Sequence, residues 1–235
     1  MAKEPRSIPP WTIRDSLAVL ALLAVSGYGT SFFLKWAGWR PPLAHQLLLA
    51  GGIQAMAVLS GVYYLVRFKY GRSLEELGLK WRNLGRSLGL GLGGGVIIFF
   101  MVILLGGLLQ RFLPEPAPQP FAELVRRAQG FRDLLLPLFL GSFLAPITEE
   151  VYFRGFFYPV LKARYGTLVG QVGSSLLFAL LHFDLFRFLP LAVGGLGLAY
   201  LYERSGSLIT PVVAHGTWNA IMILLLFFSL KLLPH

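Results

Sequence analysis

The feature that most constrains this chain is a series of long apolar runs that recur along its whole length. The chain has 235 residues, of which 55% are hydrophobic and 14% are charged, whereas soluble domains carry about 25% charged residues. A run of about 20 apolar residues can cross a bilayer as a helix, which satisfies its own backbone hydrogen bonds there. The runs are 16–34, 43–66, 88–109, 134–161, 167–183, 188–201 and 208–230. The sequence therefore predicts an all-α, polytopic transmembrane helical bundle with seven spans, give or take one.

Composition and charge exclude several other classes of protein. The absence of cysteine excludes disulfides and thiolate metal sites. The net charge of +10 would suggest a nucleic-acid partner in a soluble protein. Here the basic residues flank apolar runs and are not interleaved with stacking aromatics, so we expect no nucleic acid and only lipid around the spans.

The distribution of basic residues predicts the orientation in the membrane. With seven spans, 12 Lys and Arg residues lie on the side that carries the N-terminus and 8 lie on the other side. Cytoplasmic loops are enriched in these residues. We therefore expect a multi-pass protein of the plasma (inner) membrane with a cytoplasmic N-terminus.

Ionisable residues inside the apolar runs are concentrated in the last 90 residues: Glu149, Glu150, Arg154, His182 and His215. Such a group costs about 2.5–3.5 kcal/mol at membrane depth, which makes it a candidate for function. We therefore divide the chain into residues 1–133, with three spans and a Pro-rich linker, and residues 134–235, which carry the chemistry. Both parts are expected to form one integrated membrane domain.

The spacing of these residues predicts how they are arranged. Glu150 and Arg154 are four residues apart, so they share a helix face and can form an ion pair. Glu149 is rotated by about 100° from Glu150 and lies outside that pair. It is therefore the carboxylate that is free to act as a general base. His215 and Asn219 are also four residues apart, on another span.

The bare residues leave several functions open. They could activate water and stabilise an oxyanion. Glu149, His182 and His215 could instead hold a catalytic zinc ion, although no His-Glu-x-x-His motif is present. Intramembrane Glu and His also mark transporters and proton relays. A catalytically silent membrane adaptor is the third class.

Three motifs, taken in order on successive runs, resemble those of a known family. They are Glu149-Glu150-x-x-x-Arg154, Phe178-x-x-x-His182 and His215-x-x-x-Asn219. Together they resemble the CPBP (Abi) family, which comprises the CAAX prenyl endopeptidases and the bacteriocin-processing membrane proteins. The matching core runs from about residue 134 to 230. The first three spans carry no diagnostic match.

The resemblance implies an intramembrane endopeptidase, a glutamate-type protease similar to the CAAX prenyl proteases. By motif, Glu149 and His182 would activate the attacking water, and His215 and Asn219 would stabilise the oxyanion. Glu150, Arg154 and Phe178 would support the site. The expected substrate is a peptide or a protein, prenylated or not. No cofactor is expected, with a zinc-dependent protease as the alternative.

The expected site requires a departure from simple geometry. Straight, vertical spans would place His182 near the membrane edge opposite to Glu149 and His215. A bend at Pro137 or Pro146, or a fifth span that starts deeper in the bilayer, would bring the three residues together.

Overall fold

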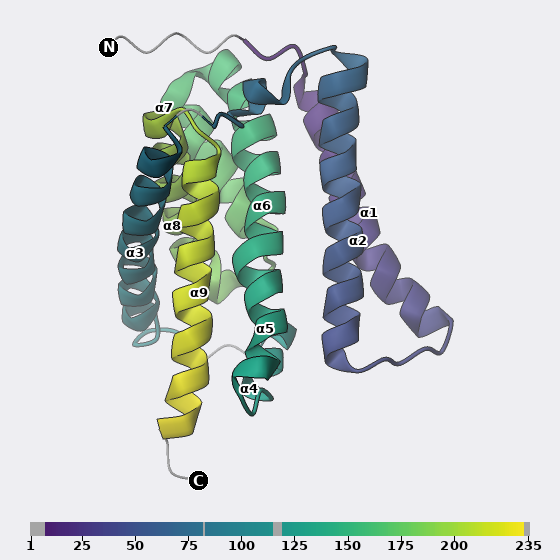
Figure 1. Cartoon of the computed structure of the whole chain (residues 1–235), viewed down its shortest axis with the longest axis vertical. Helices are drawn as coiled ribbons and strands as arrows, with labels where there is room; N and C mark the ends of the chain where they lie inside the picture. Colours follow the sequence, from purple (N-terminus) through teal and green to yellow (C-terminus); the bar gives the residue numbers. More distant parts are fainter. Residues whose placement is uncertain (1–7, 82, 115–118, 233–235) are drawn as a thin grey trace.

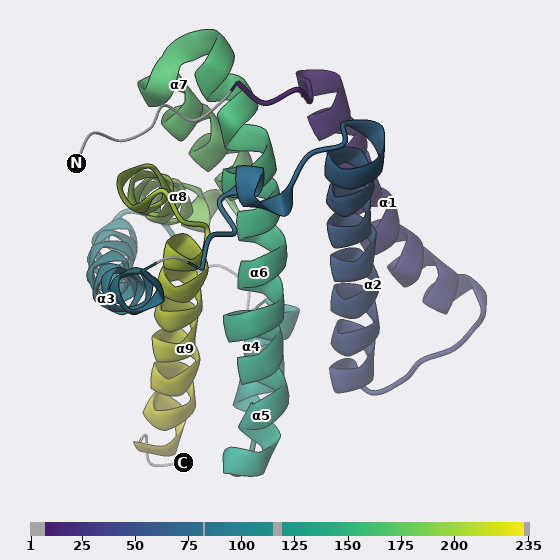
Figure 2. The same cartoon turned by 45° about the horizontal axis from the view of Figure 1, so that its top comes forward.

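The computed structural model describes residues 8–81, 83–114 and 119–232, and all regular secondary structure within them is helical. Figure 1 shows α2, α6 and α9 running along the long axis, with the start of α1 and the end of α9 at opposite ends. Figure 2 shows that α3 and α8 are inclined to these helices. The elements are α1 Ile13–Trp36, α2 Leu43–Tyr64, η1 Leu65–Lys69, η2 Leu74–Leu77, α3 Leu84–Leu109, α4 Pro120–Arg126, α5 Phe131–Phe139, η3 Leu140–Leu144, α6 Ala145–Glu150, η4 Val151–Phe157, α7 Tyr158–Leu180, α8 Leu185–Ser205 and α9 Ile209–Leu232.

The predicted polytopic helical bundle is confirmed. Six helical stretches of the described residues are long and apolar enough to cross a membrane. One of them, Phe131–Leu180, has 50 residues and includes both the fourth and the fifth predicted runs. At about 1.5 Å per residue it is more than twice as long as the ~30 Å hydrocarbon core is thick. It must therefore reverse direction.

The reversal occurs at Gly166, where φ is 84° and ψ is 170°. This combination of backbone angles is essentially restricted to glycine. The two arms then lie side by side, because a Cβ on Gly170 would be 3.0 Å from the backbone nitrogen of Lys162. A Cβ on Gly173 would likewise be 3.1 Å from the side chain of Leu161. Phe131–Leu180 is thus a helical hairpin and supplies two of the seven spans, with its tip near the top of Figure 2.

Small residues bring α3 against α8 and α9. A Cβ on Gly91 would be 2.7 Å from Val213, and one on Gly95 would be 2.5 Å from the carbonyl oxygen of Ala214, both on α9. Gly94 makes a similarly close approach to Leu201 on α8. Glycine is required at these positions because any side chain would separate the helices. These three glycines of the third span therefore serve packing within the chain.

The other side of the bundle is formed by α1 and α2, which pair with each other and stand beside α6 (Figures 1 and 2). α2 contacts α4, η3, α6 and η4, and α1 contacts η4 near its own start. The indole of Trp11 stacks on Phe156 and donates its Nε1–H to the carbonyl oxygen of Phe156 at 2.8 Å. The hydroxyl of Tyr152 donates to the carbonyl oxygen of Ser16 at 3.1 Å.

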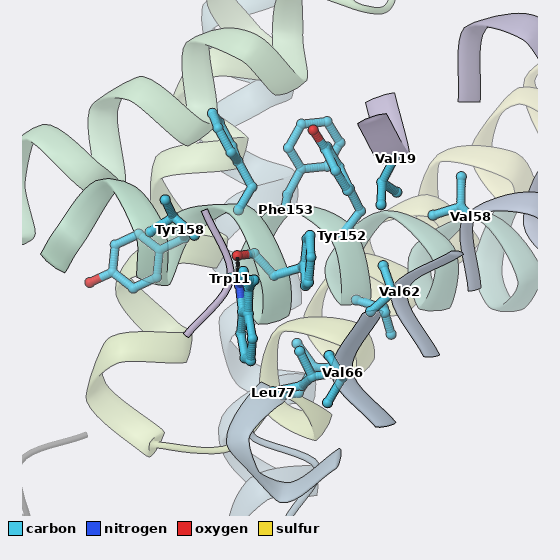
Figure 3. Packing of buried hydrophobic residues seen from close by; sticks show 14 of the residues in the cluster. Trp11, Val19, Val58, Val62, Val66, Leu77, Tyr152, Phe153 and Tyr158 are labelled. Carbon is cyan, nitrogen blue, oxygen red and sulfur yellow. Dashed lines mark hydrogen bonds between the residues drawn. The ribbon is translucent and has the colours of Figure 1, made fainter. Parts of the chain in front are cut away.

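This contact belongs to the largest cluster of buried hydrophobic residues, part of which is drawn in Figure 3. The cluster joins α1, α2, η4 and the short 3₁₀ helix η2, whose Leu77 is almost fully buried. Tyr202 on α8 donates its hydroxyl to the carbonyl oxygen of Leu77 at 3.0 Å. One end of the bundle is therefore closed by a continuous apolar core.

Candidate active site

The site is built on a buried ion pair in the central helix, which is the first arm of the hairpin and runs from α5 through η4 into α7. Nη1 of Arg154 lies 2.8 Å from Oε1 of Glu150, and both side chains are completely buried. Nη2 of Arg154 donates to the carbonyl oxygen of Gly195 on α8 at 2.8 Å. The pairing that the four-residue spacing predicts is therefore present. Its guanidinium also ties the central helix to α8.

His215 joins this pair from α9. Its Nδ1 lies 2.9 Å from Oε1 of Glu150, and its ring is almost fully buried. With that carboxylate ionised beside Arg154, Nδ1–H is the donor. Nε2 then faces the other carboxylate and lies 3.8 Å from Oε2 of Glu149. The buried pair thus fixes the orientation of the imidazole.

Glu149 and Glu150 are adjacent in sequence and lie in different environments. The Glu150 side chain is fully buried between Arg154 and His215, whereas the Glu149 side chain is 26% exposed. At 3.8 Å, its contact with His215 is longer than a hydrogen bond. Glu149 is therefore the carboxylate that can accept a hydrogen bond from an incoming molecule.

Phe178 and His182 reach the site from the second arm of the hairpin. Phe178 is fully buried, with its ring centroid 4.9 Å from the Arg154 guanidinium carbon and 5.7 Å from the centre of the His215 ring. His182 follows the end of α7, and its Nδ1 lies 2.8 Å from the carbonyl oxygen of Phe178. A carbonyl oxygen only accepts, so Nδ1 carries the hydrogen and Nε2 of the neutral ring can accept a proton.

The hairpin explains how His182 reaches the level of Glu149. Glu149 lies 17 residues before Gly166, and His182 lies 16 residues after it. Residues at equal distances from the tip of a helical hairpin lie at the same level. The hairpin thus supplies the departure from straight, independent spans that a shared site requires, through the reversal at Gly166.

Asn219 is held by a carbonyl group that the central helix leaves free. Its Nδ2 donates to the carbonyl oxygen of Gly141 at 2.7 Å. Gly141 lies in the π-helix η3, where the donor to its carbonyl would be the N–H of residue 146. That residue is Pro146, which has no N–H. One hydrogen of the Asn219 amide is thus used for orientation, and the second remains for another acceptor.

A cavity of about 1360 Å³ lies between the α1–α2 pair and the rest of the bundle. Among its lining residues are the four predicted catalytic residues and Phe178: Glu149, Phe178, His182, His215 and Asn219. Glu150 and Arg154 do not line it and lie behind His215. The contributions of the Gly141 and Gly195 carbonyls could not be predicted from the sequence, since every residue type carries a backbone carbonyl.

The zinc alternative requires Glu149, His182 and His215 to lie close together. In the part of the chain that the structure describes, no three His, Asp or Glu side chains lie close enough together to hold a metal ion. As arranged here, the three residues of the zinc alternative therefore do not form such a group.

The central part of the chain matches a known family. Residues 131–221 match the Rce1-like family, described as type II CAAX prenyl endopeptidase Rce1-like. The matched segment is about two fifths of the chain. The match includes all three motifs on which the resemblance rests, so the predicted family is confirmed over this segment.

Two curated proteins are similar to parts of the chain. An "Uncharacterized 24.3 kDa protein" of Escherichia coli is 33% identical over 147 residues, which are 60% of this chain and 61% of that protein. The "Putative membrane peptidase YdiL" of Bacillus subtilis (strain 168) is 28% identical over 90 residues, which are 38% of this chain and 37% of that protein. The alignments thus cover less than two thirds of either relative. No solved structure matches the chain.

Proposed function

We propose that this integral, multi-pass membrane protein is an intramembrane endopeptidase that uses Glu149 as the base for an attacking water. The observation that carries the proposal is that two adjacent carboxylates have different partners and different exposure. The carboxylate of Glu150 is paired with Arg154 and His215. Glu149 faces the cavity, and no described cation lies within hydrogen-bond distance of its carboxylate. The similarity of residues 131–221 to type II CAAX prenyl endopeptidases supports the same reaction class.

The proposed reaction is the hydrolysis of a peptide bond in which Glu149 transfers the proton. Glu149, assisted by the free Nε2 of His182, accepts a proton from water as the water oxygen attacks the carbonyl carbon of the substrate. The second amide hydrogen of Asn219 donates to the oxyanion that forms, and His215 contributes there when Nε2 is protonated. As the C–N bond breaks, Glu149 returns the proton to the leaving amine. The second proton of the water also passes to the amine, so the products are a carboxylate and an ammonium group.

The remaining site residues have positioning roles in this proposal. Glu150 and Arg154 hold His215 so that Nε2 faces the cavity. Phe178 packs against both rings and the guanidinium, and its carbonyl fixes the tautomer of His182. The substrate is a peptide or membrane-associated protein, prenylated or not. With a cytoplasmic N-terminus, the end of the bundle that holds η2 faces the cytoplasm.

The proposal is tested by peptide cleavage with the purified protein in detergent. A panel of fluorogenic peptides, prenylated and unprenylated, is compared between the wild type, Glu149→Gln and Glu75→Gln, each with and without a zinc chelator. Loss of a general base lowers kcat by about 10²–10⁴-fold, so Glu149→Gln is expected to abolish measurable turnover. Glu75 is exposed on η2 and outside the cavity, so its variant controls for the loss of a carboxylate.

Three outcomes would overturn this assignment. Turnover by Glu149→Gln at the wild-type rate would show that another group activates the water. Turnover that the chelator removes and zinc restores would move Glu149 and the two histidines into ligand roles. A folded wild-type protein that cleaves no peptide in the panel would argue against a peptidase and favour the transporter or adaptor class.

A further inference from the structure

The cavity that contains Glu149 is closed at one end and polar at the other. Toward η2 it is sealed by the apolar cluster of Figure 3, of which Trp11, Leu77 and Tyr158 do not line the cavity. Toward α4 its lining includes polar side chains that lie at the ends of helices or between them: Gln110, Gln119, Arg126 and Arg187. A substrate therefore reaches Glu149 from the α4 end or from the lipid beside it.

The polar end of the cavity carries positive charge. Its lining contains two guanidinium groups, Arg126 and Arg187, while Glu149 is the sole carboxylate among the described lining residues. Arg187 is neutralised by an ion pair with Asp184, which also accepts a hydrogen bond from Gln119. This part of the lining thus contains one cation that is already paired.

Arg126 differs from Arg127 and Arg187 in having no partner among the described residues. Within the described ranges no ion pair or hydrogen bond of its side chain is found, although the residue that follows it, Arg127, is paired with Glu123 at 2.8 Å. Arg126 is exposed and carried by α4, which is anchored through the almost fully buried Val125. A fixed backbone thus presents an uncompensated guanidinium to the cavity. Such a group preferentially binds carboxylates and phosphates.

The distance from Arg126 to the catalytic groups follows from packing. Val125 belongs to a buried cluster with Leu134 on α5 and Phe227 on α9. Leu134 lies 15 residues before Glu149, and Phe227 lies 12 residues after His215. At 1.5 Å per residue, the two helices give a separation of about 18–22 Å along the bundle.

We propose that Arg126 is a specificity-determining residue that binds an acidic group of the substrate peptide, about four to six residues from the bond cleaved at Glu149. The spacing follows from the 18–22 Å separation, the reach of an Arg side chain and a rise of about 3.4 Å per residue in an extended peptide. Between these two points the peptide is apolar, since small and aliphatic residues dominate the cavity wall. The inference rests on the proposed function for the identity of the occupant.

The test measures binding, so it does not depend on turnover. Fluorescent, end-blocked apolar octapeptides carry a single Glu at the first or last position, and matched peptides carry Gln there. Their Kd values are measured by anisotropy on the inactive Glu149→Gln protein, alone or combined with Arg126→Gln. Arg127→Gln is the control, because Arg127 is adjacent, equally charged and outside the cavity.

The expected result is that one Glu peptide binds about tenfold more tightly than its Gln counterpart, as a charge-assisted hydrogen bond allows. This preference should disappear with Arg126→Gln, persist with Arg127→Gln and weaken as salt is raised. Equal binding of Glu and Gln peptides at both positions would overturn the proposal. So would an Arg126-dependent affinity for anionic lipid without any preference among the peptides.

The two proposals fail separately. If the wild type cleaves peptides with Glu149 dependence and no preference for an acidic group, the endopeptidase stands and the role of Arg126 is wrong. If acidic peptides bind through Arg126 and none is cleaved by the folded wild type, the subsite stands and the catalytic assignment is wrong.

Discussion

Replacing Glu150 by Ala should destabilise the protein severely, because it leaves Arg154 as an unpaired buried charge. Both side chains are completely buried, and the guanidinium would keep only the carbonyl oxygen of Gly195 as a hydrogen-bond acceptor. Removing one partner of a buried ion pair costs about 3–5 kcal/mol. Since a factor of ten in an equilibrium corresponds to about 1.4 kcal/mol, the unfolded fraction should rise by roughly 10²–10³-fold or more.

The measurement is thermal unfolding in detergent, followed by the fluorescence of the native tryptophans. The informative comparison is the double variant Glu150→Leu/Arg154→Met, which replaces both charges by apolar groups of similar volume. Such replacements are often neutral or stabilising. We therefore expect the double variant to unfold at a clearly higher temperature than Glu150→Ala, while both lose activity because His215 is no longer oriented.

Unfolding of the single and double variants at the same temperature would contradict this explanation. In that case the destabilisation would come from the loss of volume or of the His215 contact, and the unpaired guanidinium would contribute nothing measurable.

Two further predictions concern packing and orientation. Gly216→Ala should lower both the unfolding temperature and the activity, because the added Cβ would lie too close to the carbonyl oxygen of Ser142 and force α9 away from η3. Gly93→Ala is the matched control, because its added Cβ would meet nothing within 4 Å. Equal effects of the two substitutions would contradict the packing argument. The chain has no native cysteines, so single cysteines can report the orientation. With a cytoplasmic N-terminus, Arg40→Cys should react with a membrane-impermeant maleimide in intact cells, and Lys80→Cys only after permeabilisation. The reverse pattern would mean that the N-terminus is outside.

The sequence was sufficient to predict the spans, because each depends on local composition. A run of apolar residues long enough to cross the bilayer has few alternatives to a helix. The sequence did not reveal that residues 134–161 and 167–183 continue one another through a single glycine. That connection depends on Gly166 adopting backbone angles that only glycine favours, and a glycine in an apolar chain is equally consistent with close helix packing.

For the site, the sequence predicted the contacts within one helix but not the contacts between helices. The pairing of Glu150 with Arg154 follows from helical periodicity, and so does the separate position of Glu149. The contact of His215 with Glu150 depends on how α9 packs against α6, which no local pattern encodes. The same holds for Asn219, whose partner is a backbone carbonyl. The proposed roles of these residues in catalysis stay predictions until the variants are measured.

The helical hairpin has a consequence for which changes in chain length the protein can tolerate. Because Glu149 and His182 are placed by counting outward from Gly166 along two arms of nearly equal length, a residue added to one arm rotates that side by about 100° and shifts it by about 1.5 Å relative to the other. A full turn added to both arms would preserve their register and move the pair together along the membrane normal. Relatives of different hairpin length should therefore have gained or lost residues in both arms together.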